Sequence, residues 1–295
     1  MRVAITGGTG FVGPAVVQAV LDQGHEVRVL EHHRPCEVPD QARLTRVSGD
    51  VLDDSALDRL MAEADAVIHL VAIIREKPSK GITFARLHTE ATRRAVDAAK
   101  RHSARRFILM SANGVESDID TGYYRTKREM EDLVTQSGLE WTIFRPSYIA
   151  GDRPDGFDDR FARVVDKLPL LPDFAGGQFE IQPVALSDVA RAFAKSVAMP
   201  ASVGETYVLV GPERMTWHDY LTRLKAVRGR KRIVIPAPGW AVKTAASLLG
   251  SAFPASRDQL TMMFAGNVGD PRPAAEAFGL DLVRWEDAVA GLRRD

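Results

Sequence analysis

Short apolar runs alternate with longer segments in which apolar residues recur every three or four positions through the first half of the chain. Continuous runs are typical of strands buried on both faces of a parallel sheet, and the longer period is typical of amphipathic helices. The predicted strands lie at 3–5, 27–30, 44–47, 66–72, 107–111 and 141–144. Their alternation with helices predicts an α/β fold, a doubly wound parallel sheet with helices on both faces.

Three features of this half carry more specific expectations. Asp54 is the expected cap of the helix that precedes the strand at 66–72. Apolar residues on one face predict a single helix over 84–101. Because His69 lies inside the apolar run, a hydrogen-bonded core histidine is favoured over a catalytic one.

Beyond Gly151 the pattern changes, and the chain is expected to build a smaller α/β lobe. Ser187 and Thr216 are expected helix caps. The stretch 239–253 is apolar but too short to span a membrane, so it predicts either a helix over a cleft or a docking surface for a partner protein or membrane face. The other expected elements are helices at 158–167, 188–198, 217–227 and 285–292 and strands at 181–184, 206–210 and 233–235.

A glycine-rich turn joins the first strand to the first helix, and a second strand follows Gly24. This context makes the turn a credible dinucleotide-binding fingerprint. Gly7 permits the tight turn, Gly10 lets backbone N–H groups approach a pyrophosphate, and Gly13 lets the helix pack closely on the strand. The predicted dinucleotide contacts in this turn are Gly7, Thr9, Gly10, Phe11, Val12 and Gly13.

The end of the second strand bears on the choice of nucleotide. An acid there binds the ribose 2′-hydroxyl of NAD, whereas a nearby arginine favours the 2′-phosphate of NADP. Glu31 occupies the strand end, and His32 and Arg34 follow it. The sequence therefore predicts NAD or NADP as cofactor, with a preference for NAD.

A tyrosine and a lysine stand four positions apart at the start of a predicted helix. Tyr123 and Lys127 therefore project from one helix face. A phenol with a pKa near ~10 is a poor proton donor at neutral pH, and a neighbouring ammonium is expected to lower that pKa. Lys127 is also a candidate to hold the nicotinamide ribose. Tyr124 is the adjacent alternative, but its partner four positions on is Arg128.

Composition narrows the class of protein. Lys plus Arg equals Asp plus Glu at 39 each in 295 residues, which argues against nucleic acid as a partner. The histidines lack metal-ligand spacing, and His32 and His33 on a strand would point apart, so no metal site is predicted. The single cysteine, the early first strand and the lack of a membrane-length apolar run predict a cytoplasmic protein, with a peripheral contact to the inner membrane left open.

The motifs together resemble the short-chain dehydrogenase/reductase superfamily, in its extended and atypical branches. The closest likeness is to the nucleotide-binding accessory subunit of respiratory complex I and its bacterial relatives. The superfamily likeness rests on 6–13, 49–51, 67–72, Tyr123-x-x-x-Lys127 and 145–147, and the subgroup likeness on 123–131, 181–190, 257–259 and 267–268. The likeness implies a Rossmann-type domain at 1–150 and a substrate-binding or partner-facing lobe at 151–295, with 178–210 packing back on the core.

The resemblance also implies roles for individual residues. Asp50 and Val51 would flank the adenine, Val71 and Ala72 would line the nucleotide path, and Pro146 would approach the nicotinamide. The position that best matches the family's catalytic serine is Asn113, whose amide can still donate a hydrogen bond. Ser111 stands at the end of the fifth strand and is the other candidate.

Two functions are predicted side by side. In the first, the protein is an oxidoreductase or epimerase acting on a carbonyl or sugar-nucleotide-like substrate. Tyr123 then relays a proton, Lys127 lowers its pKa, and Asn113 or Ser111 orients the carbonyl. In the second, the nucleotide is redox-inert and the protein is an accessory or assembly subunit of a respiratory NADH dehydrogenase-type complex.

Overall fold

The computed structural model describes residues 1–154, 156–249, 253 and 255–293. Contacts between Cα atoms divide the chain into two compact units. Unit 1 comprises Met1–Pro146, Ser187–Val208 and Arg272–Leu280, and unit 2 comprises Ser147–Leu186, Leu209–Pro271 and Asp281–Asp295. The return of 272–280 to unit 1 was not predicted, because the sequence carries no motif that marks it.

Unit 1 is built on a seven-stranded sheet with the order β11-β6-β5-β4-β1-β2-β3. The paired strands from β3 to β6 are all parallel, which confirms the predicted doubly wound sheet. The order reverses between β1 and β4, where the carboxyl ends of such strands open a ligand-binding crevice. The strands are β1 (Arg2–Thr6), β2 (Glu26–Glu31), β3 (Leu44–Ser48), β4 (Ala66–His69), β5 (Arg106–Met110), β6 (Glu140–Pro146) and β11 (Glu205–Leu209).

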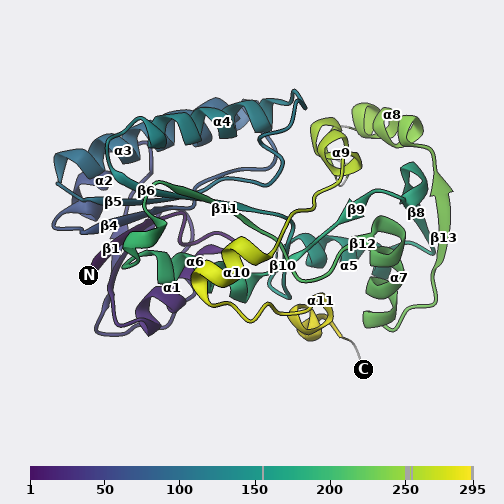
Figure 1. The fold of residues 1–295 in the computed structure, drawn as a ribbon. Helices are drawn as coiled ribbons and strands as arrows, with labels where there is room; N and C mark the ends of the chain where they lie inside the picture. Colours follow the sequence, from purple (N-terminus) through teal and green to yellow (C-terminus); the bar gives the residue numbers. More distant parts are fainter. Residues whose placement is uncertain (155, 250–252, 254, 294–295) are drawn as a thin grey trace. The chain divides into compact units, whose positions relative to one another are not determined.

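Helices cover both faces of this sheet (Figure 1). One face carries α1 (Gly13–Asp22), α6 (Leu186–Ser196) and α10 (Arg272–Phe278), and the other carries α2 (Asp54–Met61), α3 (Ala91–Arg101) and α4 (Gly122–Thr135). The apolar runs of the strands and the apolar faces of α2, α3 and α4 form one buried cluster. That burial supplies most of the free energy that holds the sheet and helices together.

His69 is a core histidine, as expected. It is fully buried, with its Nδ1 2.7 Å from Thr6 Oγ1 and its Nε2 3.2 Å from Thr92 Oγ1. Burial, with a smaller contribution from the charge of Lys127, lowers its pKa to about 3. A histidine in this state has both ring nitrogens occupied and stays neutral at physiological pH.

Two local predictions for unit 1 were wrong. The cap of α2 is Asp53, one residue earlier than predicted, because its carboxylate accepts from Ser55 N. The helix predicted over 84–101 is confirmed, but its first part, Ala85–Glu90, is π-helical and α3 follows it directly. His32 and His33 lie beyond the end of β2, and their rings approach to 3.6 Å between centroids instead of pointing apart.

Unit 2 is a smaller α/β assembly of short strand pairs and helices. Its pairs are β7 (Ile149–Ala150) with β10 (Val184–Ala185), β9 (Glu180–Ile181) with β12 (Met215–Thr216), and β8 (Leu170–Phe174) with β13 (Ile233–Ala237). Its helices are α5 (Phe157–Lys167), α7 (Trp217–Val227), α8 (Gly239–Leu249), α9 (Arg257–Phe264) and α11 (Trp285–Ala288). The 3-10 turns of unit 2 lie at Ala175–Gly177 and Ala290–Leu292, and those of unit 1 lie at Pro78–Lys80 and Pro200–Ser202.

The core of unit 2 is aromatic, and one buried carboxylate ties its segments together. Asp158 Oδ1 accepts from the Tyr220 hydroxyl and from Trp285 Nε1, each at 3.0 Å. Its Oδ2 accepts from Gly151 N at 3.1 Å. Burial raises the pKa of Asp158 to about 6, although the three donors oppose that shift.

The sequence located most elements of the second half, with errors at their ends. Thr216 caps α7 in a reciprocal capping box with Asp219, as predicted. Ser187 is not a cap, because α6 begins one residue before it. The expected strand at 181–184 is divided between β9 and β10, and the expected helix at 285–292 is the short α11 followed by a 3-10 turn. Of the apolar stretch 239–253, residues 250–252 lie outside the described residues.

Candidate dinucleotide and proton-transfer site

The glycine-rich turn has the shape that a pyrophosphate requires. Gly7 has a φ of +76°, and a Cβ on it would lie 2.8 Å from Leu70 C and Val71 N. A Cβ on Gly13 would lie 2.3 Å from Gly8 C, so the first turn of α1 can pack on the loop only without a side chain. Gly10 is different, since its nearest atom would be Gly7 O at 3.4 Å. The open space in front of Gly10 is where a ligand can approach the backbone.

The start of α1 leaves its backbone N–H groups without a side-chain cap. Val12 occupies the cap position and provides no hydrogen bond, and Pro14 pre-sets the first turn. Unsatisfied N–H groups and the positive end of the helix dipole favour an anion at this point. The turn that contains the glycines, Thr9, Phe11 and Val12 therefore ends at a helix start that favours an anion, and the individual contacts stay predictions.

Glu31 stands at the end of β2, as predicted, but its carboxylate has protein partners. Its Oε1 accepts from Arg46 Nη1 at 2.6 Å and from Cys36 N at 2.8 Å. Arg46 also donates to Cys36 O at 2.9 Å and to Val38 O at 2.6 Å. Sequence reasoning missed Arg46, because nothing in the run at 44–47 indicates a contact with Glu31. Its role is to fix the acid and the loop after β2 in one conformation.

The predicted adenine-side residues lie on neighbouring loops. His32 Nε2 is 3.5 Å from Asp50 Oδ2, so the loops after β2 and β3 meet. Val51 is buried in the cluster under this edge of the sheet, and Val71 packs against the same cluster. Arg34 is exposed on the loop that follows β2. These positions suit an adenosine on the β1–β2–β3 side of the crevice.

Tyr123 and Lys127 lie on the first two turns of α4, as predicted. Lys127 is 1% exposed, donates from Nζ to Met110 O at 2.9 Å, and holds its Nζ 5.9 Å from the centroid of the Tyr123 ring. Burial lowers the pKa of Lys127 to about 7, against the opposing effect of Glu131. Near neutral pH the ammonium form of Lys127 can therefore release a proton and its amine form can accept one.

The prediction that Lys127 lowers the pKa of Tyr123 is wrong for this structure. Burial, and then the charge of Tyr124, raise the pKa of Tyr123 well above its usual value. The phenol is therefore protonated across the physiological range and is a weaker acid than a tyrosine in water. Tyr124 is less available, because its hydroxyl donates to Asn113 O at 3.2 Å.

An aromatic group that the sequence did not reveal holds the Tyr123 ring. The ring lies edge-on to Phe84 and to His88, with centroids 5.8 Å and 5.5 Å away. His88 Nδ1 lies 2.8 Å from Thr126 Oγ1, and its Nε2 accepts from Ile73 N at 3.1 Å. Burial, with a smaller contribution from Lys127, lowers the pKa of His88 to about 3. The π-helical turn at 85–90 directs this neutral histidine toward α4, which regular helical periodicity could not predict.

The end of β5 supplies the candidate hydrogen-bond donors. Ser111 is 3% exposed, and its Oγ is buried without a partner among the described residues. Asn113 is 4% exposed, and its backbone N donates to Pro146 O at 2.9 Å. Pro146 therefore lies beside the loop that carries both candidates. A buried hydroxyl with no partner costs about 1–3 kcal/mol, which a ligand acceptor would recover.

Arg145 ties β6 to the helix that carries Tyr123 and Lys127. Its Nε and Nη2 donate to the two carboxylate oxygens of Glu131 at 2.9 and 2.6 Å. A bidentate pair of this kind fixes orientation as well as distance. The pair fixes the position of α4 against the end of the sheet, so Arg145 acts on Tyr123 and Lys127 indirectly, through Glu131.

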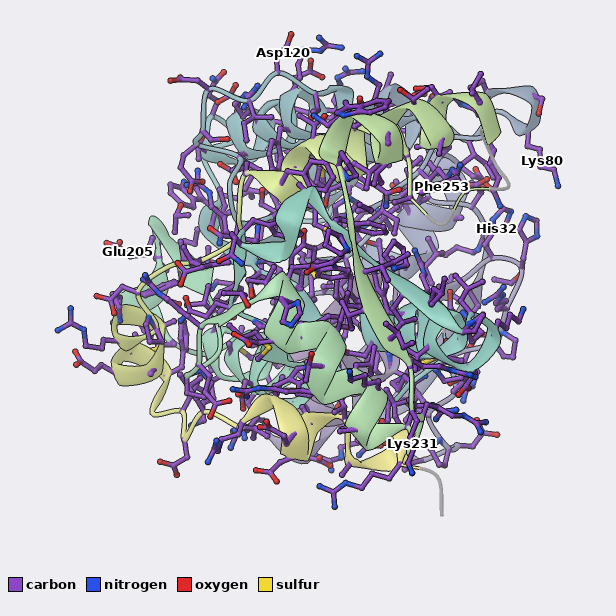
Figure 2. All side chains as sticks on the ribbon, turned by 90° about the vertical axis from the view of Figure 1, so that its right-hand side faces the viewer. His32, Lys80, Asp120, Glu205, Lys231 and Phe253 are labelled. Atoms are coloured by element: carbon purple, nitrogen blue, oxygen red, sulfur yellow. The ribbon has the colours of Figure 1, made fainter. Side chains whose placement is uncertain are left out.

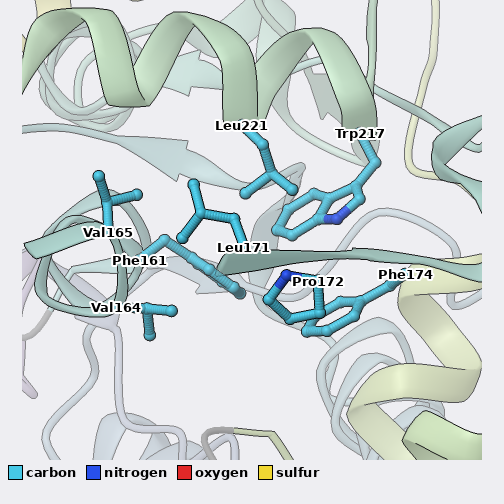
Figure 3. Close-up of a pocket in the computed structure, with 8 residues that line it drawn as sticks. All are labelled: Phe161, Val164, Val165, Leu171, Pro172, Phe174, Trp217 and Leu221. Carbon is cyan, nitrogen blue, oxygen red and sulfur yellow. The ribbon is translucent and has the colours of Figure 1, made fainter. Parts of the chain in front are cut away.

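Unit 2 contains a small apolar pocket with a cavity volume of about 10 Å³ (Figure 3). It lies between α5, β8 and α7 and is lined by Phe161, Val164, Val165, Leu171, Pro172, Phe174, Trp217 and Leu221. Trp217 Nε1 is buried here without a hydrogen-bond partner among the described residues. The pocket is smaller than the ~300–1,000 Å³ usual for a small-molecule site, so it does not by itself define a substrate site.

Comparison with known proteins agrees with this geometry. The model of a family described as NAD(P)H-binding matches residues 7–200. Over 251 residues the chain is 30% identical to the ceramide reductase of Caulobacter vibrioides, covering 84% of this chain and 77% of that protein. Over 293 residues it is 28% identical to subunit 9 of the alpha subcomplex of mitochondrial NADH dehydrogenase from Arabidopsis thaliana, covering 95% of this chain and 68% of that protein.

A solved structure supports the fold. The UDP-glucuronic acid 4-epimerase of Bacillus cereus, crystallised with UDP-glucuronic acid and NAD, superposes with a TM-score of 0.76 at 18% identity. The match covers 98% of this chain and 96% of the epimerase. Across the described residues, no helix is both long and apolar enough to cross a membrane.

Proposed function

Because the chain belongs to the NAD(P)H-binding family whose model covers residues 7–200, we propose that it is an NAD(P)-dependent oxidoreductase acting on a carbonyl substrate. The resemblance to atypical short-chain dehydrogenases, and among them to the complex I subunit, is confirmed by these relatives. Dinucleotide binding follows from the family. What we propose beyond dinucleotide binding is that the protein is catalytic, that it acts on a carbonyl substrate, and that the individual residues have the roles given below.

One observation carries the proposal. The Tyr123 ring is fixed by Phe84 and His88 above a buried lysine, and no hydrogen bond from the described residues occupies its hydroxyl. Tyr123 is half-buried, so its hydroxyl can meet a ligand. An oriented phenol with its proton available, next to a lysine whose pKa is about 7, is an arrangement suited to proton transfer.

The residues then have separate tasks in the reduction of a carbonyl. When bound, a nicotinamide dinucleotide supplies the hydride that becomes the new C–H bond. The Tyr123 hydroxyl donates its proton to the carbonyl oxygen, and Lys127 can return a proton to the resulting phenolate. Ser111 Oγ or the Asn113 amide donates a hydrogen bond that orients the same oxygen. The product is the alcohol, and the reverse sequence oxidises it.

We propose NAD as the preferred nucleotide. Arg46 occupies only Oε1 of Glu31, which leaves Oε2 to accept from a ribose hydroxyl. A 2′-phosphate at the same place would meet this carboxylate as a like charge. The exposed Arg34 is the residue that would favour NADP instead.

The substrate proposed for the first test is a ketone on an acylated long-chain amine. It is chosen because the Caulobacter relative is named a ceramide reductase. The test incubates the full chain with NADH and such a ketone, or with UDP-glucuronic acid, and follows NADH oxidation or epimer formation. We expect turnover with one substrate class, and a loss of at least about 100-fold in Tyr123→Phe. Tyr124→Phe is the matched control, and we expect its turnover to be nearly unchanged. Full activity in Tyr123→Phe would contradict the proposal.

A second function is favoured by a different observation. Asn113 stands where the family's catalytic serine is expected, and burial raises the pKa of Tyr123, which makes the phenol a weaker acid. These features suit a protein that binds the nucleotide without turnover, as an accessory subunit of a respiratory NADH dehydrogenase. That function would place the protein at the inner membrane instead of free in the cytoplasm. Co-purification with the complex from native membranes, together with inert bound nucleotide, would favour it.

A further inference from the structure

Exposed large hydrophobic side chains are concentrated in one part of unit 2. Of the nine such side chains among the described residues, six belong to β8, β13, α8 and the turn before β8. Those six are Leu168, Leu170, Ile233, Ile235, Trp240 and Leu248. A contiguous apolar patch on a protein surface usually marks a place where something binds.

The strand pair β8–β13 is apolar on the face turned away from the core. The parallel register sets Ile233 opposite Leu170 and Val234 opposite Leu171. Leu171 is fully buried and Val234 packs on the core of unit 2, whereas Leu170 is 46% and Ile233 is 65% exposed. Because side chains alternate along a strand, the outer face would be expected to be polar. Here both faces are apolar.

Helix α8 extends this surface. Val242 and Ala246 are buried in the core of unit 2, while Trp240 is 75% and Leu248 is 82% exposed. Trp240 and Leu248 are eight positions apart, so they lie on the same side of the helix, two turns from each other. Figure 2 shows β13 running from the region of Lys231 toward α8 on this side of the molecule.

The segment that contains β13 and α8 has charged residues of one sign only. The sequence has no aspartate or glutamate from 220 to 257, although the whole chain is balanced at 39 charges of each sign. The same segment carries Arg223, Lys225, Arg228, Arg230, Lys231, Arg232, Lys243 and Arg257. Arg228 and Arg230 pair with Asp166, but Arg232 donates to the carbonyl oxygens of Val165 and Asp166, and Lys231 is exposed.

We propose that this lipid-facing surface, formed by Leu168, Leu170, Ile233, Ile235, Trp240 and Leu248, docks on the surface of an anionic lipid bilayer. Exposed aliphatic side chains would enter the acyl boundary, and Trp240 suits the interface because its ring is apolar and its N–H is polar. Lys231 and Arg232 would meet the negative headgroups. A second copy of the chain is a poorer partner, because a two-fold contact would bring the same cations together.

The experiment uses the full chain and extruded vesicles of phosphatidylcholine, with or without phosphatidylglycerol. Binding is measured by co-sedimentation and by the emission wavelength of tryptophan. Trp217 and Trp285 are buried and Trp141 packs against the buried cluster of unit 1, so a blue shift on binding should come mainly from the exposed Trp240. We expect binding and a blue shift only with phosphatidylglycerol, and binding that weakens as salt is raised.

Variants test the surface itself. Ile233→Ser and Trp240→Ala should each weaken vesicle binding about tenfold because they remove inserted apolar area. Lys231→Glu should weaken binding to anionic vesicles by at least about tenfold. The matched controls are Val203→Ser and Lys80→Glu, exposed positions in unit 1 that should leave vesicle binding unchanged. All five side chains are exposed, and a thermal melt checks that each variant folds.

The proposal does not depend on catalytic turnover, so it can fail or succeed independently of the proposed function. Equal binding to neutral and anionic vesicles, no binding to either, or equal losses in the control variants would overturn it. A dimer in light scattering that Ile233→Ser dissociates would also overturn it, because a second copy would then cover this surface.

Discussion

Lys127 is buried beneath Tyr123, with its Nζ 5.9 Å from the centroid of the tyrosine ring and 2.9 Å from Met110 O. One carbonyl oxygen is a small compensation for an ammonium that is removed from water. Burying the Lys127 ammonium in this position lowers the stability of the folded protein. It also makes the site suited to proton exchange near pH 7.

The first prediction concerns the stability cost of Lys127. Its pKa falls from 10.5 to about 7 on folding, so the unfolded chain binds more protons between these values. The cost of burying Lys127 is absent above pH ~10.5, and it lowers the unfolding free energy more and more as the pH falls toward 7. Lys127→Met should therefore raise the unfolding free energy at pH 7 by roughly 2–4 kcal/mol while abolishing turnover. Denaturant unfolding at pH 7 and pH 10 measures the gain, which should shrink at the higher pH. A destabilised variant at both pH values would contradict this account.

The second prediction distinguishes Ser111 from Asn113. The Ser111 hydroxyl is buried and lacks a partner among the described residues, so a substrate oxygen is its natural acceptor. Ser111→Ala should lower kcat by about 100-fold and leave the melting temperature unchanged or higher. Ser117→Ala, which removes a hydroxyl bonded to Gly114 O, is the control for loop geometry. If Asn113→Ala loses activity and Ser111→Ala retains it, Asn113 is the donor instead.

The third prediction compares two glycines of the same turn. A Cβ on Gly10 meets no atom closer than 3.4 Å, whereas one on Gly13 would lie 2.3 Å from Gly8 C. Gly10→Ala should therefore fold normally but bind the dinucleotide at least about tenfold more weakly, because the methyl group occupies the phosphate approach. Gly13→Ala should lower the melting temperature as well. Isothermal titration with NADH and thermal melts separate the two effects, and unchanged affinity in Gly10→Ala would place the phosphates elsewhere.

The fourth prediction concerns Asp158 in unit 2. Its folded pKa of about 6 is above the ordinary value of 3.8, so the stability that it contributes is present below pH ~3.8 and lost as pH rises through 6. The shift corresponds to on the order of 3 kcal/mol. Asp158→Asn should remove this contribution to the pH dependence between pH 4 and 6. Melts followed by tryptophan fluorescence test it against Asp118→Asn, an exposed carboxylate that should change nothing. Identical pH profiles for both variants would show that Asp158 titrates normally.

The sequence predicted the sheet, the glycine turn and the pairing of Tyr123 with Lys127 because each depends on local spacing. Continuous apolar runs indicate buried parallel strands, and a four-residue spacing on a helix puts two side chains on one face. Glu31 was correctly placed at the end of β2 for the same reason.

What the sequence could not supply depends on contacts between distant segments. The direction of the Tyr123 pKa shift was mispredicted because burial outweighs the nearby ammonium, and burial is set by how π-helical Ala85–Glu90 packs on α4. Arg46 is 15 positions from Glu31, and no local pattern connects them. The exposed face of β13 was also hidden, since an apolar strand does not reveal that one of its faces is uncovered.

The most direct test of the central claim is the exchange of nucleotide on the purified protein. Mass spectrometry identifies the dinucleotide released on denaturation and its redox state, and the exchange rate is then measured with added NADH and NADPH. An oxidoreductase that releases its nucleotide in each cycle predicts exchange within seconds, with NADH preferred. A stoichiometric nucleotide that exchanges only over hours, or no binding of either nucleotide, would contradict the claim.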